Sequence, residues 1–322
     1  MAKVKTDKAT KRLSFKNDMK RYGNLFPFYI PAVAFALVFS YLPMLGLIMA
    51  FKENPNLLGG SSAIGGILEA AWAGLGNFRT IFSNPKFLSA LANTLIISFL
   101  KIVIIFPIPI MLAILISEMR SRPLKRSLQV VMYIPYFLSW ATIAGIFVSI
   151  LATETGVVNN LLAALGHERF QFLNNNEFFR SLLLLSSSWK DIGWSAVTYI
   201  AAITALDPAL NEAARIDGAT KWQQIRYVTL PGILPTVASM FILRVGYIMD
   251  AGFEQVFVFY SPFVEGKGNI LGMYTWRLIN DSGLVPQYAL STAVGFFNSV
   301  VALILVVSMN FILKRFFNKS IW

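Results

Sequence analysis

Six long apolar runs limit how this chain can fold more than any other feature. They occupy residues of about 25–49, 88–116, 127–151, 178–205, 235–259 and 288–313. A helix needs roughly 20 apolar residues to cross about 30 Å of hydrocarbon. Inside a bilayer, only helices and closed barrels satisfy every backbone polar group. We therefore expect an all-α integral membrane protein with six transmembrane helices.

The composition agrees with this class and excludes several kinds of chemistry. Hydrophobic residues make up 56% of the chain and charged residues 14%, whereas soluble domains are about 25% charged. The chain has no cysteine, which excludes disulfides, thiol catalysis and cysteine-based zinc sites. His167 is the sole histidine, so a histidine-cluster metal site or a histidine-dependent triad is excluded too. We expect neither a metal nor a catalytic residue on this chain.

The basic residues indicate which ends face the cytoplasm. The formal net charge is +12. In a membrane protein such an excess sets the topology and meets anionic lipid, so nucleic acid is not the expected partner. With the amino terminus inside, 18 basic residues fall in cytoplasmic segments and seven in external ones. We expect both termini in the cytoplasm, with residues 1–24 as a basic tail and 25–322 as the transmembrane domain.

A polar stretch at residues 207–235 separates two of the apolar runs. Asp207 followed by Pro208 favours a helix start, because the carboxylate accepts from free amides of the first turn and proline suits the first helical position. This helix should end near Ile216, where Asp217 and Gly218 break it. The basic residues place the stretch on the cytoplasmic side.

The second half of the same stretch predicts another short helix. Thr220 and Gln223 have the spacing of a capping box, and Leu230 followed by Pro231 is expected to end the helix they open. The sequence therefore predicts a helix-turn-helix at the cytoplasmic membrane surface.

The spacing of Glu-Ala-Ala, glycine and Leu-Pro in this stretch resembles the cytoplasmic signature of the permease subunits of bacterial ABC importers. The matching residues are Glu212, Ala213, Ala214, Gly218, Val228, Leu230 and Pro231. The resemblance implies the type I importer permease fold, with a shared core of about 88–313 and a coupling loop at 207–235 that docks on an ATP-binding subunit. Coupling is expected from Glu212, Ala213, Ala214, Asp217, Gly218, Leu230 and Pro231.

Further short pieces look like the branch of these permeases that takes up oligosaccharides and polysaccharide fragments. They lie at 41–44, 51–52, 76–78, 93–98, 120–126, 133–135, 189–194 and 252–257. One departure is the stretch 260–262, which reads Tyr-Ser-Pro where Tyr-Asn-Pro is expected. The resemblance implies an importer subunit that transports a saccharide in the bacterial plasma membrane.

The resemblance also implies the partners. They are a second, related permease that forms a heterodimer with this chain, two ATP-binding subunits and an extracytoplasmic solute-binding protein. The chain has no Gly-x-x-x-x-Gly-Lys-Ser/Thr pattern, so the phosphate-binding loop must lie on another subunit. We expect no cofactor on this chain, with Mg-ATP bound by the partner subunits.

Ionisable residues inside the apolar runs are costly in a bilayer and mark candidate solute contacts. Sugars suit aromatic faces and paired polar groups, and both occur together in the fourth run. The candidate pathway comprises Trp189, Lys190, Asp191, Trp194, Arg244, Asp250, Glu254 and Gln255. Alternatively, Lys190 with Asp191, or Arg244 with Asp250, only joins helices by ion pairing. Lys101 is less informative, because it could pair with a neighbouring span.

Several other residues predict local structure. Asn93 and Asn298 are expected to form hydrogen bonds between helices. Pro107, Pro109 and Pro135 are expected to kink their helices. The glycine-rich piece at 58–66 is expected to be a flexible loop.

Two alternatives to a saccharide permease make different demands on the sequence. A membrane enzyme of glycan or lipid metabolism would need a clustered acid, base or metal site, and the sequence has no histidine cluster, cysteine or Asp-x-Asp motif. An ABC permease for amino acids, phosphate or metal ions would share the coupling signature but lack the branch-specific pieces.

Overall fold

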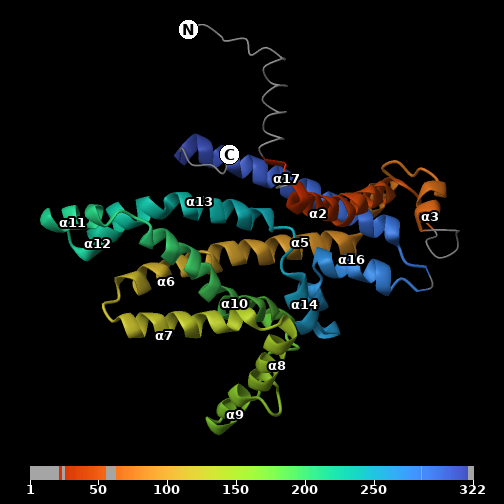
Figure 1. Ribbon diagram of the computed structural model, residues 1–322. Helices are drawn as coiled ribbons and strands as arrows, with labels where there is room; N and C mark the ends of the chain where they lie inside the picture. The colour runs from red at the N-terminus through yellow and green to blue at the C-terminus, as the bar shows by residue number, and fades with distance from the viewer. Residues whose placement is uncertain (1–21, 24–25, 56–62, 284, 318–322) are drawn as a thin grey trace, which may run out of the picture.

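The computed structural model describes residues 22–23, 26–55, 63–283 and 285–317, and within these ranges nearly all regular structure is helical (Figure 1). A lone bridge between Lys52 and Trp72 is the only β pairing in the described residues. The all-α class predicted from the apolar runs is therefore confirmed. In chain order the α-helices are α2 (Phe26–Ala36), α3 (Ala63–Glu69), α4 (Gly76–Ser83), α5 (Pro85–Leu100), α6 (Pro107–Glu118), α7 (Arg122–Tyr133), α8 (Trp140–Leu151), α9 (Val157–Ala164), α10 (Asn176–Thr204), α11 (Pro208–Ile216), α12 (Lys221–Gln224), α13 (Leu230–Gly246), α14 (Phe253–Phe259), α15 (Glu265–Gly268), α16 (Leu271–Asn280) and α17 (Tyr288–Phe317).

Within the described ranges, four continuous helices are long and apolar enough to cross a membrane. They are Pro27–Phe51, Pro85–Glu118, Lys221–Gly246 and Tyr288–Arg315. A fifth candidate is the pair Arg122–Phe137 and Trp140–Leu151, which is bent by 104°. The fourth predicted run lies in α10, which is long enough but carries three serines, Lys190 and Asp191 in its middle. The described residues thus contain four or five candidate spans by length and composition, and the predicted number of six is not confirmed.

Three π turns in the described chain each precede a proline. They span Leu37–Tyr41, Lys101–Ile105 and Ile225–Thr229, and Pro43, Pro107 and Pro231 follow them. In each turn the residue before the proline donates its N–H to the carbonyl five residues earlier. Proline clashes with the carbonyl four residues back and lacks an N–H. The wider turn places that clash where the helix can absorb it.

This arrangement corrects the prediction that Leu230 and Pro231 end a short helix. The π turn lets α12 continue through Pro231 into α13, so residues Lys221–Gly246 form one helix. The second arm of the predicted helix-turn-helix is therefore the beginning of the fifth apolar segment. Pro107 is accommodated in the same way between α5 and α6.

The fifth predicted span, 235–259, is wrong as a single helix. Helix α13 ends at Gly246 and α14 begins at Phe253. Between them, Ala251 and Gly252 have φ values of 55° and 86°, a left-handed backbone that no α-helix continues through. The intervening residues are mostly apolar, so hydrophobicity gave no sign of this break.

The third span breaks near Pro135, which the sequence predicted as a kink. Residues Ile134–Phe137 form a 3-10 turn after α7. Ser139 then caps α8 by accepting from the N–H of Thr142 at 3.1 Å. The strong bend thus combines a proline with a new helix start.

The stretch 260–287, between the fifth and sixth apolar runs, is largely folded in its described part. Helix α16 packs beside α5 and α17, and Ile270 and Leu271 are fully buried. Asn93 ties this segment to α5 by donating to the carbonyl oxygens of Gly266 and Asn269 at 2.9 and 3.1 Å. It also accepts from Arg180 of α10, so its predicted role between helices is confirmed. The amide oxygen of Asn298 is buried and finds no partner in the described part of the chain.

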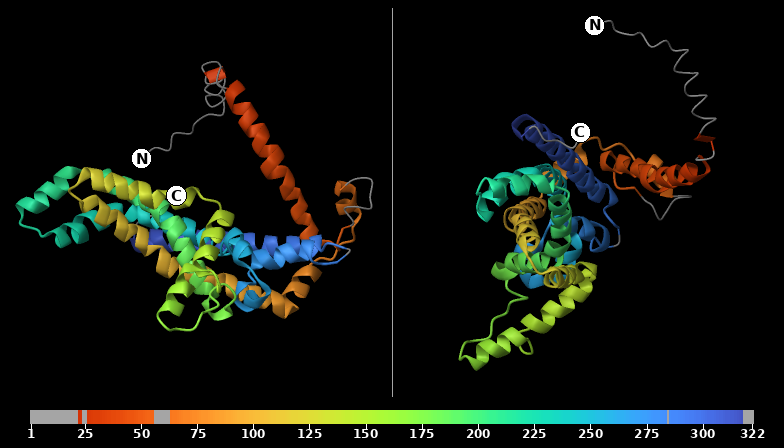
Figure 2. Two further views of the ribbon diagram at one scale, coloured as in Figure 1. Left: turned by 90° about the horizontal axis from the view of Figure 1, so that it is seen from below. Right: turned by 60° about the vertical axis from the view of Figure 1, so that its left-hand side comes forward.

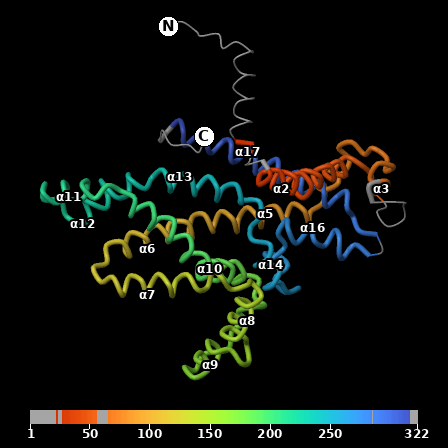
Figure 3. The backbone as a smooth tube through the Cα atoms, viewed as in Figure 1, coloured from red at the N-terminus to blue at the C-terminus, as the bar shows by residue number. Residues whose placement is uncertain are grey.

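The glycine-rich piece is described only in part. Residues 58–62 lie outside the described ranges, whereas 63–66 begin helix α3 and so are not a loop there. The helix of the first span projects away from the other helices and joins them near its carboxyl end (Figure 2). The α11–α12 hairpin lies at one end of the bundle, and α16 lies toward the opposite end (Figure 3).

Candidate functional site

The hairpin of α11 and α12 begins and ends on local signals. The side chain of Asp207 accepts from the N–H of Ala209 at 2.9 Å, and Pro208 is the first helical residue. At the other end, the N–H of Gly218 bonds Arg215 and that of Ala219 bonds Ala214, which is a Schellman motif. Gly218 has a φ of 78°, and nothing lies within 4 Å of where its Cβ would stand. The backbone conformation, and not lack of space, therefore requires glycine.

The capping box predicted at the start of α12 is present. Gln223 donates its N–H to the hydroxyl of Thr220, and its side-chain oxygen accepts from the N–H of Thr220 at 2.7 Å. The turn between α11 and α12 is therefore fixed from both sides. Helix α12 leads directly into α13, so the second arm of the hairpin is the beginning of a long helix.

The predicted coupling residues divide into two places. Glu212, Ala213, Asp217 and Gly218 are exposed on α11 and its terminal turn, and Ala214 is half-buried there. Leu230 and Pro231 lie beyond the π turn, where the long helix enters the bundle. Large apolar side chains are also exposed on the hairpin, with Ile216 87% and Trp222 66% accessible. This surface has the mixture of apolar and charged groups that protein partners bind.

An ion pair braces the hairpin against the end of α6. Lys221 pairs with Glu118 across a cavity of about 520 Å³ that Arg120 and Arg215 also line. Both partners are partly exposed, so the pair contributes little to stability. It does attach the hairpin to the second apolar segment.

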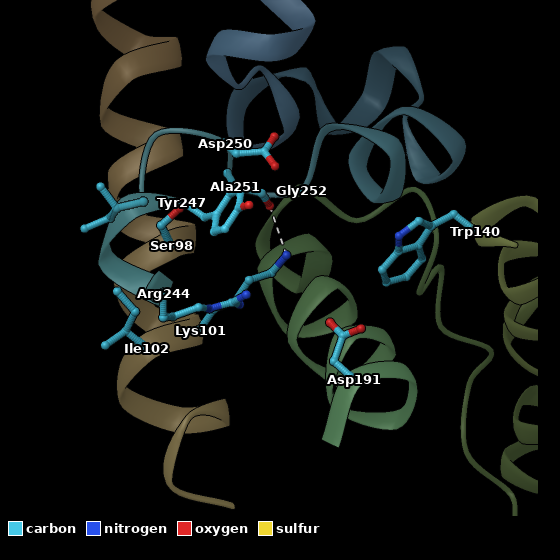
Figure 4. Close-up of a pocket in the computed structure, with 11 residues that line it drawn as sticks. Ser98, Lys101, Ile102, Trp140, Asp191, Arg244, Tyr247, Asp250, Ala251 and Gly252 are labelled. Atoms are coloured by element: carbon cyan, nitrogen blue, oxygen red, sulfur yellow. Dashed lines mark hydrogen bonds between the residues drawn. The ribbon is translucent and has the colours of Figure 1, made fainter. Parts of the chain in front are cut away.

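Two adjoining cavities lie where α5, α10 and α13 meet. The first, about 210 Å³, is shown in Figure 4, and the second, about 230 Å³, extends beside α6 and α10. Asp191, Arg244 and Tyr247 line both cavities. We refer to them together as the central cavities.

Half of the predicted pathway residues line the central cavities. Asp191, Arg244 and Asp250 line the first and Trp194 the second. Trp189, Lys190, Glu254 and Gln255 line neither. Trp189 packs on Phe147 of α8, and Glu254 is exposed at the start of α14.

Lys190 and Gln255 point to structural partners. The ammonium of Lys190 donates to the carbonyl oxygens of Tyr136 and Leu138 at the bend of the third span. It also lies 5.4 Å from the ring centroid of Trp140. Gln255 is fully buried and bonds α10 through Leu183 and two serines.

The ion pairs that would only join helices are absent from the described residues. In the described chain, no ion pair within 4.0 Å joins Lys190 to Asp191 or Arg244 to Asp250. The four pairs that do form involve Arg169, Lys221, Lys267 and Arg277. Asp191, Arg244 and Asp250 therefore line the central cavities without an ion pair among the described residues.

Sequence reasoning undervalued Lys101 and missed Ser98, which both line the first cavity. Lys101 is 5% exposed and donates to the carbonyl of Ala251 at 2.9 Å and to the amide oxygen of Gln255 at 2.7 Å. Ser98 is 6% exposed, and its hydroxyl has no partner in the described residues. Their spacing of three residues, which places polar groups on one face of an apolar helix, was the available signal.

About two thirds of the chain match the sequence model of one protein family. A sequence model described as "Binding-protein-dependent transport system inner membrane component" matches residues 105–320. The chain belongs to this family. It is therefore a membrane transport subunit, and the permease can be compared with its relatives over nearly its whole length.

Two relatives from Bacillus subtilis (strain 168) resemble the permease closely. The polygalacturonan/rhamnogalacturonan transport system permease protein YteP is 36% identical over 312 residues, which are 97% of this chain and 94% of the relative. Protein LplB is 34% identical over 314 residues, or 98% and 96% of the two chains.

A solved structure shows the same fold. The permease matches a chain of a bacterial ABC transporter involved in the import of the acidic polysaccharide alginate, with a TM-score of 0.84 and 36% identity. The match covers 94% of this chain and 99% of that chain. A second structure of the alginate transporter, in complex with an alginate pentasaccharide-bound periplasmic protein, matches with the same TM-score. The type I importer permease fold is therefore confirmed.

Proposed function

We propose that the permease carries an oligosaccharide or polysaccharide fragment across the bacterial plasma membrane as a subunit of an ATP-driven importer. The saccharides named for its relatives support this substrate class. The alternative, a permease for amino acids, phosphate or metal ions, has no comparable support among these relatives. Both termini lie in the cytoplasm in this proposal, because the basic residues favour that orientation.

The observation that carries the proposal is one continuous helix between the hairpin and the central cavities. Residues Lys221–Gly246 form it, so α12 lies at its outer end and Arg244 lines both cavities at its inner end. A helix of 26 residues is about 40 Å long. A tilt imposed on the hairpin therefore moves Arg244 and Tyr247 relative to α10.

Energy enters through the exposed hairpin in this proposal. Two ATP-binding subunits bind Mg-ATP, and this chain holds no cofactor. Glu212 forms a charge-assisted hydrogen bond to a basic group on one of them, while Ile216 and Trp222 supply apolar contact. ATP binding shifts the transporter between states only if these contacts differ between them. Gly218, and the exit of the long helix at Leu230 and Pro231, set the angle of the hairpin.

The remaining partners complete a solute pathway. A second, related permease forms a heterodimer with this chain, and an extracytoplasmic binding protein delivers the saccharide. The solved alginate transporter with a bound periplasmic protein supports the last of these partners. In the central cavities, Trp194 and Tyr247 offer aromatic surface to the sugar rings. Asp191, Arg244 and Asp250 offer hydrogen-bonding groups to hydroxyl or carboxylate oxygens.

The test is a reconstituted transporter with all of its subunits and its binding protein in vesicles. ATP hydrolysis and uptake are measured over a panel of neutral and acidic oligosaccharides, with amino acids, phosphate and metal ions as controls. We expect one class of oligosaccharide to stimulate both activities, and the permease alone to hydrolyse no ATP. A response confined to the control solutes would contradict the proposal.

A further inference from the structure

Residues 247–252 connect helix α13 to helix α14, and these two helices are attached to different parts of the molecule. Helix α13 is continuous with the hairpin at the far end of the bundle. Helix α14 is packed into the largest buried cluster, where Val256 and Phe259 meet Phe179 and Leu182 of α10. We call residues 247–252 the joint. The joint therefore connects α13, which can move with the hairpin, to α14, which is held in the buried cluster.

The fixed side of the joint is held by one buried ammonium from another helix. Lys101, in the π turn between α5 and α6, donates to the carbonyl of Ala251 and to the side chain of Gln255. Gln255 in turn accepts from Ser187 at 2.9 Å and donates to the Leu183 carbonyl at 2.7 Å. Three segments, α5 to α6, α10 and α14, thus meet at one polar contact, while α13 takes no part in it.

A lysine at position 101 is informative, because burying its charge in an apolar segment costs free energy. A lysine inside an apolar segment is disfavoured in a bilayer unless its donors are used. The Ala251 carbonyl and the Gln255 amide oxygen, which Ser187 also reaches, take two of its three N–H groups. The third N–H group is not used by any described hydrogen bond, and Lys101 lines the first cavity.

Gly252 leaves room for this contact. A Cβ at Gly252 would stand 2.9 Å from Nζ of Lys101, closer than real Cβ atoms approach other atoms. The φ of 86° independently favours glycine at this position. The joint and the ammonium therefore fit each other.

We propose that Lys101 is a positioning residue that fixes the α14 side of the joint, so that movement of α13 pivots at residues 247–252 and reaches the central cavities. This inference rests on the proposed function as an ATP-driven importer. With Lys101 in place, α14 stays on α10 while Arg244 and Asp250 move. Without it, α14 follows α13 and the movement is lost from the cavities.

The first experiment compares Lys101→Met with wild type in the complete reconstituted transporter. The readout is the amount of saccharide moved per ATP hydrolysed. We expect this ratio to fall by about tenfold, the factor that loss of one hydrogen bond to a charged group imposes on an equilibrium. Lys86→Met is the control, because Lys86 is exposed on the same helix. A ratio equal to wild type, or uptake and hydrolysis falling in parallel, would overturn the proposal.

A second variant disturbs the contact without changing the lysine. Gly252→Ala displaces the ammonium and should lower the same ratio. The double variant should lose less than the sum of the two single losses, because both changes remove the same contact, while alanine also strains the backbone at this φ. If the losses in the transport ratio add fully in the double variant, the two changes do not act through one contact, and the proposal is overturned.

A third measurement does not depend on the solute and so separates this inference from the proposed function. The chain has no cysteine, so Leu234→Cys and Phe257→Cys place unique spin labels on exposed positions of α13 and α14. ATP should change the distance between the labels in the complete transporter, and Lys101→Met should suppress that change. An equal change in both proteins would overturn the role of Lys101, whichever solute is transported.

Discussion

The ammonium nitrogen of Lys190 lies 2.9 Å from the carbonyl oxygen of Tyr136. It also donates to the carbonyl of Leu138, the residue that follows the 3-10 turn in the third span. Carbonyls at a helix end have no partner within the helix, and lysine side chains can satisfy them. Lys101 satisfies Ala251 at the break of the fifth segment in the same way. Each of these two breaks is therefore held by a buried lysine from a neighbouring helix.

The first prediction concerns Lys190. Lys190→Met should destabilise the permease by about 1–3 kcal/mol, because two partly buried carbonyls lose a donor. The measurement is the thermal unfolding midpoint of the purified transporter, with Lys86→Met as an exposed control. A weaker solute affinity at unchanged stability would instead favour a direct role in the pathway.

The second prediction concerns the contact between α10 and α7. A Cβ on Gly193 would lie 1.8 Å from the carbonyl oxygen of Met132, and backbone cannot move aside cheaply. Gly193→Ala should therefore lower the amount of folded permease in the membrane, at a cost of about 1–3 kcal/mol or more. Gly145→Ala is the matched control, because it lies within α8 with nothing inside 4 Å of its Cβ position. Equal yields for both variants would contradict the close packing.

The third prediction concerns the hairpin. Glu212→Ala and Gly218→Asp should each abolish uptake and leave the protein in the membrane, because both positions are exposed. Gly218→Asn should retain more activity than Gly218→Asp, since both residues tolerate the left-handed backbone but asparagine adds no charge to this exposed surface. Membrane abundance and uptake are measured together. Normal uptake by Glu212→Ala and Gly218→Asp would contradict a coupling role.

The fourth prediction concerns Arg244, which has no ion-pair partner among the described residues. Arg244→Gln should raise the half-saturation concentration for acidic oligosaccharides by about tenfold, because a charge-assisted hydrogen bond is lost. Neutral oligosaccharides should be affected less. Equal effects on both classes would show that Arg244 does not bind a carboxylate.

The fifth prediction concerns pH and an exposed pair outside the fourth apolar run. The hydrogen bond from Lys267 is the main cause that lowers the pKa of Glu177 below its usual value. A lowered pKa in the folded state means that the pair stabilises the protein at neutral pH and is lost as pH falls through that pKa. The unfolding midpoints of wild type and Glu177→Gln should therefore differ slightly at pH 7 and converge in acid. A difference that grows on acidification would contradict this assignment.

Local signals were sufficient where structure is decided within a few residues. Asp207, Thr220 with Gln223, and Gly218 act on backbone groups close in sequence, so the ends of α11 and the start of α12 follow from their spacing. The long apolar helices are likewise decided by hydrophobic length.

Apart from the bend near Pro135, the breaks and continuations of the helices were not predicted, and the break near Ala251 involves a contact distant in sequence. Pro231 does not end a helix, since a π turn precedes it. The joint at Ala251 exists in an apolar stretch and is bonded by Lys101, 150 residues away in the chain. Only half of the predicted pathway residues line the central cavities. The sequence does not show which face of a helix meets its neighbours, so the other half could not be separated from them.

The π turns also change how substitutions along these helices should be interpreted. One additional residue in a turn rotates everything beyond it by about 100° around the helix axis, since a regular turn holds about 3.6 residues. Side chains before and after Lys101–Ile105 therefore follow two different angular phases. Deleting a single residue within that turn would bring the two halves of the helix into register and turn α6 away from α10. In this permease, the length of a span and the direction in which it presents its side chains are thus set independently.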